Sequence, residues 1–180
     1  MRYDPETHHR RSIRLKGYHY SQPGLYAVTI CSWHRQPLFE TPEVHEILST
    51  TWLSLPDRFP TVTVELFVIM PDHVHSMLRL HSAAKDTSTP TLGQIIGAYT
   101  SLTTVAWLRW NKSRGMRCSR HLWQERFYDH IVRNDQDAQR IREYILNNPL
   151  KVQLQQGKEI DDKMLEVIMS TLYSTFQRDD

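Results

Sequence analysis

The stretch VTVELFVIMPDHVHSMLRL, residues 62–80, decides the fold of this chain. Residues 62–70 alternate valine or leucine with other side chains, which is the two-residue period of a strand that is buried on at least one face. Pro71 and Asp72 interrupt this pattern, and residues 73–80 resume it as a second strand. Because the connection is so short, we expect the two strands to form an antiparallel hairpin.

The segments on either side of the hairpin complete the order of elements. They predict a strand at 25–32, a helix at 42–55, a helix from 92 that ends before Gly115, a strand at 127–132, and a last core helix from 134 that is closed by Pro149. The order strand, helix, strand, strand, helix, strand, helix is typical of a ferredoxin-like α+β sandwich. In this fold an antiparallel sheet carries its helices on one face, and residues 73–80 form a central strand.

Length and composition limit the function classes. A chain of 180 residues with 23% charged and 39% hydrophobic residues is typical of a single folded domain. Cys31 and Cys118 are too far apart to indicate a disulfide framework or a zinc ligand set, which favours a reducing, cytoplasmic setting. The longest apolar run, residues 66–70, is far too short for a membrane span, and we expect no membrane partner.

Positive charge is concentrated in two parts of the chain. Residues 1–20 carry five Lys or Arg against two acids, and residues 105–126 carry six against one. Such surfaces suit phosphate backbones, because each neutralised phosphate releases condensed counterions. Basic clusters are also common on ordinary solvated faces, so charge alone leaves both interpretations open.

His73 and His75 are the first candidate site residues. Side chains alternate along a strand, so both imidazoles point to the same face, opposite to Val74 and the helices. Their Cα atoms are expected to lie roughly 6 to 7 Å apart, a span that two rings can close around one divalent ion. The alternative is a pair of partly exposed histidines with no ligand.

Tyr144 and Asn148 are the second pair. They are four residues apart on the last core helix, so they share one helix face, beside the buried stripe of Ile141 and Ile145. A phenol and an amide oxygen are thereby presented together. Aromatic residues on helices usually belong to the core, and an Asn before Pro is usually a C-terminal cap, so the combination with the histidine pair is what favours a site.

Three motifs together resemble a known family. The runs MPDHVH at 70–75, WQERFYDH at 123–130 and YILNNPLK at 144–151, in this order, are similar to the single-tyrosine HUH transposases, particularly the REP-associated and insertion sequence 200-like transposases. The similarity spans about residues 10–152. Asp72 departs from the pattern, since relatives commonly carry Asn there; we expect this difference to change a turn and not a ligand.

The resemblance implies a specific chemistry. His73, His75 and Asn148 would hold Mg²⁺ or Mn²⁺, and Tyr144 would be the nucleophile. Tyr144 would attack a phosphodiester of single-stranded DNA near a hairpin, form a 5′-phosphotyrosine and leave a free 3′ hydroxyl. A second 3′ hydroxyl would then reverse the reaction, which gives DNA recombination and transposition.

Other residues are weaker candidates. Tyr128 and Tyr99 are rival nucleophiles; Tyr99 lies on the apolar stripe of its helix, whereas Tyr128 could line the site or contact DNA. His130 could act on a proton. The expected DNA contacts are Tyr128, His130 and the basic residues of the N-terminal arm, Arg10, Arg11, Arg14 and Lys16, and Trp33 or Trp123 could stack on an unpaired base or belong to the core.

The sequence also predicts an organisation and leaves alternatives open. We expect a basic arm at 1–22, the transposase domain at 23–152 and a tail at 153–180 with a helix near 161–176. The long arm and tail favour a monomer over a dimer. Two other functions remain: a regulator that binds hairpin DNA or RNA without cutting it, and a zinc hydrolase, which would leave Tyr144 and Asn148 unexplained.

Overall fold

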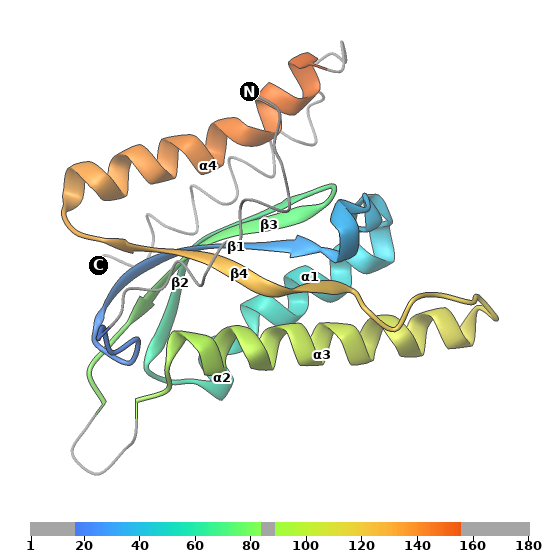
Figure 1. Cartoon of the computed structure of the whole chain (residues 1–180), viewed down its shortest axis with the longest axis horizontal. Coiled ribbons are helices and arrows are strands. Elements are labelled where there is room, and N and C mark those ends of the chain that lie inside the picture. Colours follow the sequence, from blue (N-terminus) through green and yellow to red (C-terminus); the bar gives the residue numbers. More distant parts are fainter. Residues whose placement is uncertain (1–16, 84–88, 156–180) are drawn as a thin grey trace.

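The computed structural model describes residues 17–83 and 89–155 of the chain. Its centre is a four-stranded antiparallel sheet with the strand order β2-β3-β1-β4 (Figure 1). The strands are β1 (Gly24–Ser32), β2 (Val62–Met70), β3 (His73–Leu80) and β4 (Trp123–Val132). The predicted hairpin is β2–β3, and β3 lies between β2 and β1 in the sheet.

Helices cover one face of this sheet. They are α1 (Pro42–Leu53), the short α2 (Leu55–Arg58) and α3 (Leu92–Ser113), and two single-turn 3₁₀ helices, η1 (Trp33–Arg35) and η2 (Leu38–Glu40), connect β1 to α1. Thr91 and Gln94 form a capping box that fixes the start of α3. The main core lies between these helices and the sheet, and the predicted α+β sandwich is confirmed. Over the described part of the chain, every helix is too short or too polar to cross a bilayer.

The opposite face carries α4 (Asp135–Gln155) (Figure 1). Ala138 and Ile145 of α4 pack on a smaller apolar cluster of the sheet, which includes Val68 and Met77. This is the face toward which His73 and His75 point, because they have the same strand parity as Met77. The face predicted to be free of helices is therefore partly covered by α4, and the side chains of α4 lie close to the histidine pair.

Two predicted boundaries are wrong. The last helix does not close at Pro149 but continues to Gln155. The proline removes only one backbone hydrogen bond, and the residues after it, LKVQLQ, are compatible with helix. Strand β4 starts at Trp123, four residues before the predicted start, since a register shift between Ile30 and Ser32 lets β1 continue its pairing with β4 to that point. The predicted helix near 161–176 lies outside the described residues.

Candidate metal and nucleophile site

The imidazole rings of His73 and His75 lie side by side on the α4 face of the sheet. Their Nε2 atoms are 3.0 Å apart, and the two ring planes are nearly perpendicular. His75 is 5% exposed and His73 is partly buried. The two Nε2 atoms therefore point toward one common position on the α4 face of the sheet, near the start of β3.

The other nitrogen of each ring has its own partner. His73 Nδ1 lies 2.6 Å from Asp72 Oδ1, and His75 Nδ1 lies 2.8 Å from the hydroxyl of Thr29, its neighbour across β1 and β3. A carboxylate can only accept, so Nδ1 of His73 donates and its Nε2 keeps a lone pair. If His75 likewise donates to Thr29, two lone pairs face each other across 3.0 Å, an arrangement that a cation between them stabilises.

Burial keeps His75 neutral. It lowers the pKa of His75 to about 4, and the neighbouring His73 and Arg35 side chains add to this effect. At neutral pH the imidazole is therefore uncharged, which is the form in which histidine binds a metal ion.

Asn148 of α4 supplies a third group. Its amide nitrogen is 2.8 Å from His75 Nε2, and a half-turn of the amide about its χ2 bond presents the oxygen to the same position. Ligand atoms at neighbouring corners of an octahedron around Mg²⁺ lie about 3 Å apart, since metal–ligand bonds are about 2.1 Å. Among the described residues no group of three His, Cys, Asp or Glu could hold a metal ion, so the amide is what extends the histidine pair to three donors.

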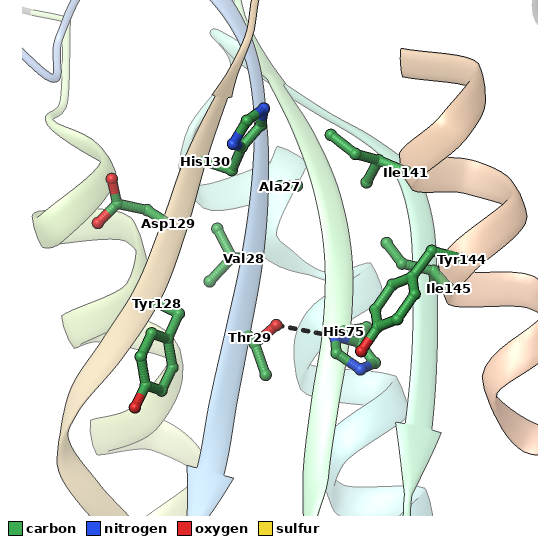
Figure 2. A pocket seen from close by; sticks show the side chains of 10 residues that line it. All are labelled: Ala27, Val28, Thr29, His75, Tyr128, Asp129, His130, Ile141, Tyr144 and Ile145. Atoms are coloured by element: carbon green, nitrogen blue, oxygen red, sulfur yellow. Dashed lines mark hydrogen bonds between the residues drawn. The ribbon is translucent and has the colours of Figure 1, made fainter. Parts of the chain in front are cut away.

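Tyr144 extends from α4 over this group. Its ring centre is 5.7 Å from that of His75, at an angle of 76°, and its side chain is 54% exposed. Tyr144 and Tyr128 both line a hollow of about 200 Å³. In Figure 2 the Tyr144 phenol lies next to the His75 ring, and Tyr128 lies on the other side of Thr29. The phenol is therefore open to solvent and lies beside the donor atoms.

The rival tyrosines are placed differently. Tyr99 is fully buried, its hydroxyl donates to the backbone oxygen of Leu48 at 3.3 Å, and burial raises its pKa well above the usual value. Tyr99 is a core residue and cannot reach DNA. Tyr128 is exposed and lines the same hollow as Tyr144, on the face of β4 next to Thr29.

Charged groups hold α4 on the sheet. His130 of β4 contacts Asp137 at 2.7 Å, near the start of α4. Glu65 of β2 contacts Arg142 at 2.8 Å and Arg79 at 2.6 Å. Sequence reasoning did not identify Glu65 or Arg142; the only signal was an acidic residue in an otherwise apolar strand.

The remaining candidates are not all near the site. Arg10, Arg11, Arg14 and Lys16 lie outside the described residues. Trp123 is buried and donates from its indole nitrogen to Thr103 at 2.9 Å, so it belongs to the core. Trp33 is partly exposed and stacks on His121, with ring centres 4.6 Å apart.

Comparison with known proteins establishes the family. A family model described as an IS200-like transposase matches residues 23–148. This chain belongs to the IS200-like transposase family. The transposase is 31% identical over 173 residues to an uncharacterised protein of Haemophilus influenzae, with 83% of this chain and 93% of that protein covered. It is 27% identical over 160 residues to a second protein of that bacterium, which has the provisional name REP-associated tyrosine transposase, with 89% of this chain and 84% of that protein covered.

A solved structure agrees on the fold of the transposase. It is that of a REP-associated tyrosine transposase bound to a REP hairpin, with a TM-score of 0.56 and 19% identity over 77% of this chain and 73% of that one. The family resemblance predicted from the three motifs is thereby confirmed, and so is the fold. Transposases are DNA-processing enzymes, which places the function class of this chain.

Proposed function

We propose that this transposase cleaves and rejoins single-stranded DNA at ends that carry hairpins, through a 5′-phosphotyrosine formed by Tyr144. The observation that carries this proposal is the position of the exposed Tyr144 phenol, whose ring centre is 5.7 Å from that of His75, within a group of three converging donor side chains. Tyr99 is buried in the main core, and Tyr128 lies on β4, paired with Thr29 of β1. The name of one relative and the hairpin bound in the solved structure support the choice of DNA substrate.

His73, His75 and Asn148 are the residues that would hold a divalent cation, Mg²⁺ or Mn²⁺. Transposases of this family generally depend on such a cation. Two imidazoles and an amide suit Mn²⁺ and also Mg²⁺ when water and phosphate oxygens complete the coordination. The cation, when bound, would polarise the scissile phosphate and stabilise the charge that develops on its oxygens.

Tyr144 would carry out the covalent step. Its phenol oxygen forms a bond to phosphorus and gives up its proton to water, while the bond from phosphorus to the 3′ oxygen breaks and that oxygen leaves as a hydroxyl. The 5′ phosphate is then joined to Tyr144, and no other reactant is consumed. Attack by another 3′ hydroxyl on this linkage releases Tyr144 and joins the strands.

One chain would suffice for this chemistry. His73 and His75 lie on β3, and Tyr144 and Asn148 lie on the α4 helix of the same chain, which packs on the sheet through Ala138 and Ile145. This arrangement supports a monomer as the active unit.

The test is covalent capture of the DNA. Single-stranded DNA with a hairpin, labelled on the 3′ side of the expected cut, is incubated with the protein and Mn²⁺ and run on a denaturing gel. We expect a labelled protein band that disappears in Tyr144→Phe and remains in Tyr128→Phe, the matched variant in the same hollow. Binding without an adduct would support the non-cleaving regulator, and cleavage that persists in Tyr144→Phe would support a hydrolase; either result would overturn the proposal.

A further inference from the structure

The turn after β1 has an unusual backbone. His34 and Arg35 have φ angles of 53° and 56°, in the left-handed region that residues other than glycine rarely adopt. The turn is fastened to the β2–β3 connection by two backbone hydrogen bonds. Ser32 N–H donates to the oxygen of Asp72 at 2.8 Å, and Phe39 N–H donates to the oxygen of Pro71 at 3.0 Å. The strained residues are therefore held against the start of the strand that carries the histidine pair.

This backbone brings Arg35 to the candidate metal site. Arg35 Nη1 donates to Asp72 Oδ2 at 3.1 Å, while the other oxygen of Asp72 accepts from His73 Nδ1 at 2.6 Å. Exposure falls along this chain of contacts, from 52% for Arg35 to 28% for Asp72 and 15% for His73. The guanidinium thus lies at the solvent edge of the site, one carboxylate away from a candidate metal ligand.

Neutralising the charge of Asp72 does not by itself explain the left-handed backbone at His34 and Arg35. An exposed ion pair contributes little to stability, whereas two consecutive left-handed residues are unfavourable. Strained backbone of this kind is typical of segments that position a functional side chain. A guanidinium has five N–H donors in a planar fork that fits phosphate, and the contact with Asp72 uses one nitrogen and fixes the orientation of the others.

We propose that Arg35 is a phosphate-binding residue of this site, which contacts a backbone phosphate of the substrate strand next to the one that is cleaved. Asp72 is a positioning residue that holds both the Arg35 guanidinium and the His73 ring. The inference rests on the proposed function for the identity of the ligand, a single-stranded DNA. The Arg35 guanidinium adds a positive charge to the site that does not depend on a metal ion.

The test measures DNA binding without cleavage. Single-stranded hairpin DNA is titrated with Tyr144→Phe protein in EDTA at several salt concentrations. Adding Arg35→Gln should weaken binding about tenfold and should reduce the slope of log affinity against log salt by about 0.7, the value for one phosphate contact on a single strand. Arg58→Gln is the matched control, because it removes the same charge from an exposed position on α2, on the other face of the sheet, and it should change neither quantity.

A second background separates phosphate binding from charge neutralisation. If Arg35 only neutralises Asp72, then Arg35→Gln has no effect once Asp72→Asn has removed the negative charge. We expect Arg35→Gln to weaken DNA binding in the Asp72→Asn background as well, by at least fivefold. Equal affinities with and without Arg35 in that background would overturn the proposal.

Metal affinity gives an independent readout. Mn²⁺ titrated into the DNA-free protein should bind more weakly to Asp72→Asn, because Asp72 contacts His73 Nδ1. It should bind no more weakly to Arg35→Gln, because that change removes a positive charge near the candidate ligands. Loss of Mn²⁺ binding in Arg35→Gln would mean that the residue supports the fold of the site and would overturn its role at phosphate. None of these measurements depends on cleavage. A wild-type protein that forms no adduct would therefore contradict the proposed function, whereas the role of Arg35 is decided by the binding data.

Discussion

At the scale of single residues, the arrangement depends on which ring nitrogen of each histidine is occupied. Asp72 and Thr29 each contact an Nδ1 atom, so the Nε2 atoms remain available at the common position. Outer partners of this kind set the tautomer and the ring orientation of metal-binding histidines. The sequence predicted that the two rings share a face, from strand parity alone. It could not predict these partners, because Thr29 reaches His75 only through the pairing of β1 with β3, and the Arg35 contact depends on a left-handed turn that contains no glycine.

The first prediction concerns Thr29. Replacement by valine removes the hydrogen bond to His75 Nδ1 and keeps the shape of the side chain, so the free ring can change its tautomer. We expect Thr29→Val to weaken Mn²⁺ binding about tenfold, measured by isothermal titration calorimetry. Thr63→Val is the matched control, because Thr63 contacts His81 at the same 2.8 Å, outside the donor group. Mn²⁺ affinity in Thr29→Val equal to that of the wild type would show that Thr29 does not orient His75.

At the scale of elements, α4 determines where Tyr144 and Asn148 lie. Its apolar contact with the sheet is small, and polar contacts fasten it at three levels, through Asp137, Arg142 and Asn148. The helical spacing of Tyr144 and Asn148 was predictable from the sequence. The contact made by Arg142 was not, because a bulge in β2 between Val64 and Leu66 sets the position of its partner Glu65.

The second prediction concerns Glu65. Glu65→Gln weakens the ion pairs with Arg79 and Arg142, and both arginines can still be hydrated because they are partly exposed. We expect the free energy of unfolding to fall by about 1–2 kcal/mol and Tm to decrease by several degrees, measured by thermal unfolding. Adduct formation should also decrease, because α4, which carries Tyr144, is held less firmly on the sheet. Glu43→Gln, which weakens an exposed pair with Arg114, should change Tm and adduct formation little; a similar effect of the two variants would contradict a special role of Glu65.

The third prediction is a pH dependence. Hydrogen bonds from His130 and Arg140 hold the pKa of Asp137 at about 2, whereas an unfolded Asp titrates near 3.9. The folded state therefore keeps the carboxylate ionised at pH values where the unfolded chain binds a proton, so this contribution is complete above about pH 4 and is lost as the pH falls toward 2.

The variant Asp137→Asn tests this sign. It should be less stable than the wild type at neutral pH, and the difference should shrink as the pH decreases from about 4 to about 2, measured by denaturant unfolding at each pH. Asp129→Asn, on the same strand as His130, gives the comparison for the loss of one carboxylate. A difference between wild type and Asp137→Asn that stays constant across this range would rule out the linkage.

At the scale of the whole molecule, the two faces of the sheet have separate roles. One face carries α1, α3 and the main core, with Tyr99 and Trp123 inside it, and the other face carries α4 and the candidate site. Hydrophobic periodicity predicted the first face well, because burial there is nearly complete. The second face is half polar, and its geometry depends on contacts between segments far apart in the sequence, which periodicity does not report.

The fourth prediction concerns the assembly. If one chain provides both the histidine pair and Tyr144, the protein should act as a monomer of 21.4 kDa, measured by light scattering. A mixture of Tyr144→Phe and His75→Ala proteins should then form no adduct with DNA. In an intertwined dimer one composite site would contain both intact groups, and adduct formation by the mixture would contradict the monomer.

The most direct test of the central claim is to locate the covalent bond. The denatured product of the reaction with hairpin-bearing single-stranded DNA and Mn²⁺ is digested with nuclease and protease and analysed by mass spectrometry. We predict a nucleotide joined through its 5′ phosphate to the peptide that contains Tyr144. A nucleotide on Tyr128, or cleaved DNA with every tyrosine unmodified, would contradict the account.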